Sequence, residues 1–232
     1  MSTKTTPLGL CDAVRNYPLF EGLTASDLGE ITDLMDIVPA AKGKLIMGHG
    51  DATRDVYFLV SGSVIGQLVA ANGKEILFTE IGEGGHFGEL SALDGATRSI
   101  SISATSDCEL AVLSSTRFIE ILKKHPQVAI NLSKELSCRL RAMNERVFGL
   151  VVHDVETRVR TRLLQLAQAQ EQLMEGGVIS DLPTHEAMAG YVGSNREAVS
   201  RSMAKMVKAG VIKTDRKKVR INDLGALLAS AE

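Results

Sequence analysis

The sequence predicts an α+β protein in which a β-rich N-terminal domain is followed by a long helix and a compact helical module. Short apolar segments with β-branched or alternating residues, separated by glycines, fill residues 42–113. Beyond Pro126 the apolar residues recur at helical spacing instead. The 232 residues of the chain are enough for one large domain or two ordinary ones.

The N-terminal segments are predicted to be the strands of a barrel or jelly roll. Many short strands at regular spacing are typical of these architectures. The candidate strands lie within residues 44–50, 55–70, 75–82, 99–106 and 108–114. Asn72-Gly73, between two of these segments, is the strongest signal for a β-hairpin in the chain.

A single long helix is predicted from Pro126 to Val152. Proline is favoured in the first turn of a helix, where its missing N–H costs nothing. Five apolar residues recur at the spacing of a coiled-coil heptad: Leu136, Leu140, Met143, Val147 and Leu150. Either the protein's own β-domain or the same helix of a second subunit could cover this stripe. The Arg and Glu residues beside the stripe favour the second subunit.

The C-terminal residues predict three helices and a small basic hairpin. The helices are expected at residues 155–174, 185–192 and 196–210, and the hairpin at residues 211–223. Asp154, Thr184 and Asn195 precede the three helices as natural N-caps. Two short helices joined by a tight, glycine-containing turn form the helix-turn-helix signature, and the hairpin after them would be a wing.

Positive charge is concentrated in this C-terminal module. Residues 196–220 carry nine basic and two acidic side chains, a charge of +7 in a chain whose net charge is −2. A basic segment on an acidic body indicates a polyanionic partner. The exposed face of the last helix is expected to present Arg196, Glu197, Ser200, Arg201 and Lys205. Arg can donate two hydrogen bonds to guanine and Glu can accept one from cytosine, so this face suits the major groove.

Two plainer explanations of the basic module remain open. The helices could be a structural pair with surface ion pairs, or the charge could be a solvated face with no partner. The basic hairpin favours DNA. Aromatic residues are 4% of the chain and Trp is absent, which argues against a single-strand binder and for duplex DNA. The other face of the last helix is expected to be buried and consists of Val199, Met203, Met206 and Val207.

Other functional classes find little support in the sequence. Cys11, Cys108 and Cys138 form no disulfide framework and no C-x-x-C clamp, which is typical of a reducing cytoplasm. No apolar run reaches the roughly 18–20 residues that span a bilayer, and the N-terminus does not resemble a secretory signal. We find no nucleophile–base arrangement, metal-spaced cluster or nucleotide-hydrolysing loop, so the protein is not expected to be an enzyme.

Residues 88–99, "GELSALDGATRS", place a carboxylate, a guanidinium and a hydroxyl inside the apolar, β-rich part of the chain. Burying an unpaired charge is expensive, so such groups are usually kept out of a strand-rich core. Either Glu89 and Arg98 neutralise each other, or they are held apart to bind something polar.

Two motifs together resemble one family of bacterial regulators. "FGELSALDGATRS" is similar to the phosphate-binding cassette of cyclic-nucleotide-binding domains, and "GSNREAVSR" is similar to the recognition turn and helix of the cyclic-AMP receptor protein branch of the CRP-FNR family. The resemblance covers nearly the whole chain. It implies a cyclic-nucleotide-binding β-roll with N-terminal helices at residues 1–124, a dimerisation helix at 125–152 and a winged helix-turn-helix domain at 153–232.

The resemblance also implies the roles of the cassette residues. Glu89 would accept a hydrogen bond from the ribose 2′-hydroxyl, and Arg98 and Ser99 would bind the cyclic phosphate. The backbone of Gly88 and Leu90 would lie close to the ligand. No metal is implied.

The sequence departs from the family where the base is recognised. The family uses a Thr-Ser pair on the long helix to bind adenine across the subunit boundary, and the matching residues here are Met143 and Asn144. Asn144 can still donate and accept hydrogen bonds, whereas Met143 cannot replace a hydroxyl. Cyclic AMP is the favoured ligand, and cyclic GMP stays in contention.

For the C-terminal module, the resemblance implies that base edges are read by Arg196, Glu197 and Arg201. Phosphates would be positioned by Thr184, His185 and Asn195. A homodimer formed through the long helix would bind a palindromic operator in double-stranded DNA. RNA polymerase could be a further partner, but residues 167–177, "AQAQEQLMEGG", do not match the promoter-contacting surfaces of the family's best-known activator.

The predicted function is therefore that of a cyclic-nucleotide-responsive transcription regulator. The alternative is the same fold sensing another effector, such as haem, a gas or a redox signal. An iron–sulfur sensor needs about four thiolates, and only Cys11 lies near the N-terminus. Haem ligation by His49 or His86 is conceivable, although both are expected to be ordinary loop residues.

Overall fold

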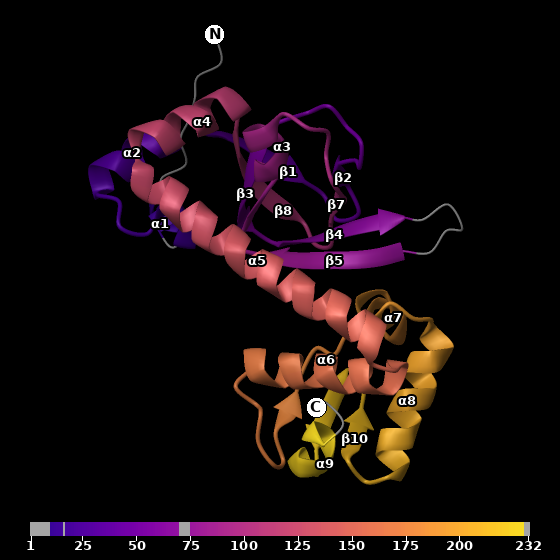
Figure 1. Ribbon diagram of the computed structural model, residues 1–232. Helices are drawn as coiled ribbons and strands as arrows, with labels where there is room; N and C mark the ends of the chain where they lie inside the picture. The colour runs from indigo at the N-terminus through magenta and orange to yellow at the C-terminus, as the bar shows by residue number, and fades with distance from the viewer. Residues whose placement is uncertain (1–9, 16, 70–74, 230–232) are drawn as a thin grey trace. The chain divides into compact units, whose positions relative to one another are not determined.

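Two antiparallel sheets form the β-domain of the computed structural model, which describes residues 10–15, 17–69 and 75–229 (Figure 1). The first sheet has the order β1 (Asp36–Ala40), β8 (Cys108–Leu113), β3 (Val56–Ser61) and β6 (His86–Phe87). The second has the order β2 (Leu45–Met47), β7 (Ser101–Ala104), β4 (Ser63–Val69) and β5 (Glu75–Gly82). Buried side chains from both sheets share one apolar cluster, which includes Leu59, Val64 and Ile102. The predicted α+β class and β-roll are confirmed.

The stretch 55–70 forms two strands because Gly62 interrupts it. Gly62 has φ +91°, and a Cβ atom there would lie 2.4 Å from the carbonyl oxygen of Asp107. A residue with a side chain is therefore excluded at this corner. The predicted Asn72-Gly73 turn lies outside the described residues, while β4 and β5 on either side of it are hydrogen-bonded neighbours.

Helices cover the first sheet with a second apolar core. They are α1 (Leu10–Arg15), the 3-10 helix η1 (Pro18–Phe20), α2 (Ala25–Thr32) and α4 (Ser115–Lys124). Tyr17, Phe20 and Phe58 pack ring against ring, with centroids 5.4–6.3 Å apart. The hydroxyl of Tyr17 donates a 2.8 Å hydrogen bond to the carbonyl of Leu59, which joins the N-terminal segment to β3.

The long helix α5 (Pro126–Val152) begins and ends where the sequence predicts. Its first turns join the second apolar core through the buried Val128 and Leu132. Further along, the heptad stripe is exposed to solvent in the single chain, with Leu140 62% and Val147 52% exposed. Leu136, the first residue of the stripe, is partly buried against this core, whereas Leu140 in the same unit is exposed.

The chain forms two compact units, of which the first comprises residues 1–74 and 78–140 and the second residues 75–77 and 141–232. The second unit contains the C-terminal half of α5 and the helix-turn-helix elements. These elements are α6 (Val155–Ala169), β9 (Val178–Ile179), α7 (His185–Val192), α8 (Arg196–Lys208), β10 (Ile212–Asp215), β11 (Lys218–Ile221) and α9 (Leu224–Leu228). Strands β10 and β11 form the predicted hairpin, and β9 adds a third strand that the sequence did not reveal.

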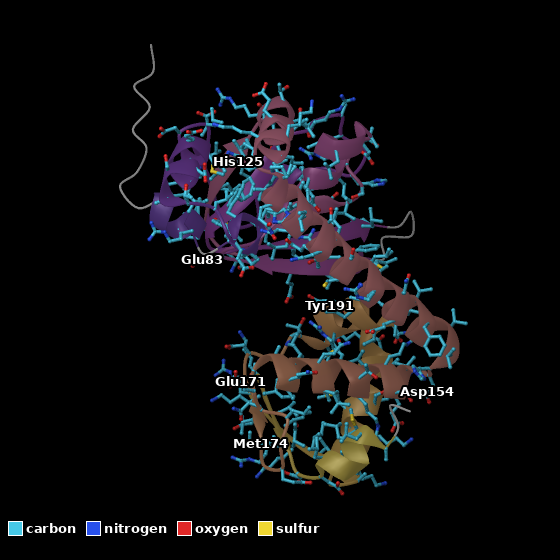
Figure 2. The ribbon with its side chains drawn as sticks, turned by 60° about the vertical axis from the view of Figure 1, so that its left-hand side comes forward. Glu83, His125, Asp154, Glu171, Met174 and Tyr191 are labelled. Atoms are coloured by element: carbon cyan, nitrogen blue, oxygen red, sulfur yellow. The ribbon has the colours of Figure 1, made fainter. Side chains whose placement is uncertain are left out.

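The helix predicted at residues 155–174 is wrong at its C-terminal end, because α6 stops at Ala169. Glu171 adopts φ +55°, which a helix cannot contain. The backbone N–H of Gln172 closes the end by donating to the carbonyl of Ala167 at 2.7 Å. Glu171 and Met174 are labelled in this turn in Figure 2.

None of the helices in the described ranges is long and apolar enough to cross a membrane.

Candidate functional site

The stretch 88–99 forms a short helix between two glycines. Gly88, with φ +88°, precedes α3 (Glu89–Asp94), and Gly95, with φ +73°, ends it. A Cβ atom on Gly88 would lie 2.7 Å from the carbonyl oxygen of Asp55 and 2.8 Å from Nη1 of Arg98. The glycine therefore lets the backbone approach the arginine, which a side chain would prevent.

Arg98 is buried, with 1% of its surface exposed, and uses all three guanidinium nitrogens. Nε donates to Oγ1 of Thr53 at 3.0 Å, Nη1 to the carbonyl of Gly88 at 2.9 Å, and Nη2 to the carbonyl of Asp55 at 2.8 Å. These bonds fix the side chain, and none of the three acceptors carries a charge. Burial lowers the pKa of Arg98, yet an arginine does not lose its proton in proteins. The site thus holds a fixed cation.

Glu89 is also buried, and its ion-pair partner is an arginine of the long helix. Nη1 of Arg139 lies 2.8 Å from Oε1 of Glu89, and Nη2 of Arg139 lies 2.6 Å from Oε1 of Glu135. The neutralisation of Glu89 by Arg98 that the sequence left open is not what forms here. Sequence analysis missed Arg139, for which the only signal was the i, i+4 spacing of Glu135 and Arg139.

His86 is a buried residue of β6, so the expectation that it is a loop residue is wrong. Its Nδ1 lies 3.8 Å from Oε2 of Glu135, and its buried Nε2 has no hydrogen-bond partner in the described part of the chain. Burial lowers the pKa of His86, while Glu89 and Glu135 oppose the shift. His49 does lie exposed in a turn, as expected.

These side chains line one pocket of the β-domain. The predicted residues Gly88, Glu89, Leu90, Arg98 and Ser99 all contribute to its wall. Arg139 adds a second cation, and the remaining lining residues are Met47, Thr79, Ile81, Phe87, Ser91, Ile100 and Ile102. The pocket lining thus combines three charged side chains, Glu89, Arg98 and Arg139, with mainly apolar ones. Met143 and Asn144 lie in the second compact unit, on the exposed part of α5, and do not line this pocket.

The second candidate site is the helix-turn-helix pair α7 and α8. Oγ1 of Thr184 accepts from the N–H of Ala187 at 3.2 Å, and Oδ1 of Asn195 accepts from the N–H of Ala198 at 2.8 Å, so both predicted caps are confirmed. Gly193, with φ +63°, ends α7 and makes the turn.

The outer face of α8 carries the three predicted base-reading residues. Arg196, Glu197 and Arg201 are exposed. The inner face holds three buried residues, Val199, Met203 and Met206. Val207 was expected on that inner face, but it is 39% exposed because it lies toward the wing side of the helix, in the cleft described below.

Two polar residues of α8 differ from the expectation of a free outer face. Ser200 is half-buried, and its Oγ lies 2.7 Å from Nδ1 of His185, which joins the two helices. Nζ of Lys205 lies 2.6 Å from Oε2 of Glu156, so this lysine forms an ion pair with α6. Both partners are distant in sequence, and residue spacing along α8 could not reveal them.

A cleft of about 580 Å³ separates α8 from the wing. Its polar lining includes Thr184, His185, Lys208, Lys217 and Lys218, together with one carboxylate, Asp215. Lys217, in the turn of the wing, has φ +56°. The wing and the start of α7 therefore present basic and hydroxyl groups on either side of one hollow.

Family models match both parts of the chain that carry the candidate sites. A model of the cyclic nucleotide-binding domain matches residues 37–125, and a model of the Crp-like helix-turn-helix domain matches residues 157–230. The CRP-like cAMP-activated global transcriptional regulator of Mycobacterium tuberculosis is 31% identical over 208 residues, which are 88% of this chain and 92% of that protein. The chain belongs to the CRP/FNR family of transcriptional regulators.

Solved structures of CRP/FNR regulators share the fold. The catabolite activator protein of Thermus thermophilus is 28% identical, with a TM-score of 0.55, over 92% of this chain and 98% of that one. The c-di-GMP responsive global regulator CLP of Xanthomonas campestris has a TM-score of 0.74 at 21% identity, over 86% of this chain and 99% of that one. This CRP/FNR member is accordingly a DNA-binding transcription regulator with a cyclic nucleotide-binding domain, and its family is one of regulators rather than enzymes.

Proposed function

We propose that this protein is a regulator gated by a cyclic mononucleotide, with cyclic AMP favoured and cyclic GMP as the alternative. The observation that carries the proposal is the fixed, buried cation of Arg98, held only by neutral acceptors at the wall of a pocket. A phosphate there gains a charge-assisted contact without breaking an existing ion pair. Ser99, exposed at the same wall, supplies a hydroxyl donor.

The carboxylate of the pocket is assigned to the sugar. Glu89 accepts from the ribose 2′-hydroxyl, while the backbone of Gly88 and Leu90 lies along the ligand. Because Glu89 is paired with Arg139 in the free chain, the ribose hydroxyl joins an existing ion pair. The apolar wall, which includes Ile81 and Ile100, suits the flat face of the base.

Base identity is assigned to Met143 and Asn144 of α5. Both are exposed in the single chain, as residues that meet a ligand across a subunit boundary need to be. Similarity to the cAMP-activated regulator of Mycobacterium tuberculosis supports cyclic AMP as the proposed ligand of this chain. A relative of the same fold responds to c-di-GMP, so another effector is the alternative that a binding experiment must address.

We infer that the DNA-binding form is a homodimer. The exposed heptad stripe of α5, with Leu140, Val147 and Leu150 between 41% and 62% exposed, supports pairing with a second copy of the helix. A twofold dimer would bind a palindromic operator with half-sites about one helical turn apart. Since its partner is chromosomal DNA, the proposed compartment is the cytoplasm.

On DNA, Arg196, Glu197 and Arg201 are proposed to read base edges in the major groove. Thr184, His185 and Asn195 are proposed to position phosphates, which sets the register without reading sequence. The lysines of the wing add phosphate contacts from the other side of the cleft. RNA polymerase is the further partner that promoter regulation implies.

Calorimetric titration with cyclic AMP and cyclic GMP tests the proposal. We expect one or both to bind at one site per chain. If neither binds, and the protein instead takes up a cyclic dinucleotide or haem, the assignment of the pocket is wrong.

Changing Met143 to threonine should shift the ratio of the two dissociation constants toward cyclic AMP. The hydroxyl supplies the hydrogen-bonding group that Met143 lacks, a contact of about 0.5–1.5 kcal/mol, or about twofold to tenfold in the ratio. Met143→Leu is the matched control, since it keeps an apolar side chain of similar size and should leave the ratio unchanged. An identical ratio in Met143→Thr and the wild type would count against a role in base recognition.

A further inference from the structure

The end of the long helix contacts the helix-turn-helix pair at the residues just before the recognition helix. Nη2 of Arg146, on α5, donates to the carbonyl of Gly190 at 3.2 Å. Gly190 lies in the last turn of α7, where a cation is favoured by the helix dipole. The side chain of Arg146, on α5, therefore binds a backbone carbonyl at the C-terminal end of α7.

The neighbouring residue, Tyr191, is held by a second arginine. The guanidinium of Arg162, on α6, lies 4.0 Å from the centroid of the Tyr191 ring, within the range of a cation–π contact. Tyr191 is labelled in Figure 2. Burial lowers the pKa of Arg146, and the charge of Arg162 acts in the same direction while Tyr191 opposes it. Arg146 and Arg162 thus bind neighbouring parts of the same segment, Arg146 at the carbonyl of Gly190 and Arg162 at the ring of Tyr191.

One turn further along α5, Leu150 packs against the turn itself. A Cβ atom on Gly193 would lie 2.6 Å from Cδ2 of Leu150, so the leucine reaches the backbone of the turn, where the φ of +63° favours glycine. Two residues later Asn195 caps α8, and Arg196 begins it. The last turns of α5 consequently contact the end of α7 and the turn that leads into the recognition helix α8.

We propose that Arg146, Arg162 and Tyr191 form a junction latch that fixes the start of the recognition helix to the end of the long helix. The proposal rests on the proposed function, because it assigns the latch to the coupling between nucleotide and DNA. None of the three residues lines the nucleotide pocket or belongs to the proposed base-reading set. Nucleotide binding and DNA binding influence each other equally, so weakening the latch lowers their coupling in both directions.

The test compares DNA affinity with and without cyclic AMP. The probe is a palindromic duplex selected from random DNA by the wild-type protein in the presence of cyclic AMP. In the wild type, the ratio of the two dissociation constants measures the coupling. In Arg146→Leu and Arg162→Gln we expect this ratio to fall by about fivefold or more, the lower end of usual allosteric coupling. The affinity of the free protein for cyclic AMP should stay within about twofold, because the pocket is intact.

Arg15→Leu is the matched control, since it removes an exposed arginine from α1 and should keep the wild-type ratio. A purely structural role would weaken DNA binding equally with and without nucleotide, leaving the ratio unchanged, and that result overturns the latch. Thermal unfolding shows whether each variant is folded. If Arg146→Leu is unfolded, the comparison is made with Arg162→Gln alone. A wild type that binds neither cyclic AMP nor any selected duplex overturns the proposed function itself, and the latch with it.

Discussion

Arg98→Leu should abolish cyclic nucleotide binding, as measured by calorimetry with both nucleotides. The substitution removes a cation that three hydrogen bonds hold at the wall of the pocket. In the proposed complex, Arg98 and the cyclic phosphate form a buried ion pair. Removing one partner of such a pair costs about 3–5 kcal/mol, which is a loss of affinity of at least about 100-fold. The affinity would fall below the range that calorimetry detects.

The same substitution also has a structural cost, so the experiment needs a control. Leucine leaves the carbonyls of Gly88 and Asp55 without their donor, at about 1–3 kcal/mol for each buried group. Arg98→Lys keeps the charge but lacks the guanidinium fork, so it should fold and recover part of the affinity. Thermal unfolding of both variants separates stability from binding. Wild-type nucleotide affinity in a folded Arg98→Leu protein would place the effector elsewhere.

The sequence predicted the starts of α5, α6, α7 and α8 because these depend on local chemistry. Pro126, Asp154 and Asn195 each begin or cap a helix where the sequence indicates. A cap needs only a side-chain acceptor and the backbone N–H groups that follow it, and both can be read within four residues. The end of α6 was missed because Glu171 turns the chain with a positive φ in a segment that is otherwise compatible with a helix.

Strands β1 and β6 of the β-domain also escaped prediction, because they depend on pairing rather than pattern. Strand β1 contains Pro39, which is tolerated there because β1 lies at the edge of its sheet. Strand β6 has only two residues, and its backbone pairs with β3. Neither feature can be recognised in a short window of sequence.

In the candidate site, too, residues within one motif could be predicted, whereas their distant partners could not. Glu89 and Arg98 stand in one motif, and the structure brings both to one pocket. Their actual partners come from elsewhere: Arg139 is fifty positions beyond Glu89, and Thr53 is forty-five before Arg98. Only the folded chain reveals that the carboxylate is tied to the long helix whereas the arginine is tied to neutral backbone and hydroxyl groups.

Arg196→Ala should reduce sequence discrimination on DNA more than it reduces overall affinity. Arg196 is exposed at the first position of α8, beside the exposed Glu197, where a guanidinium can reach guanine with two hydrogen bonds. Loss of such a contact costs about 1–3 kcal/mol at one base pair, or about fivefold to 150-fold. The measurement compares the selected palindrome with duplexes changed at single positions, at one fixed salt concentration.

Lys217→Ala provides the contrast, because the wing lysine is exposed and is proposed to contact phosphate. It should weaken binding to all duplexes alike and lower the slope of log K against log salt by about one. Arg196→Ala should leave that slope nearly unchanged while it removes the preference at one position of each half-site. If Arg196→Ala instead weakens every duplex equally, Arg196 is a phosphate contact, and base reading on this face falls to Glu197 and Arg201.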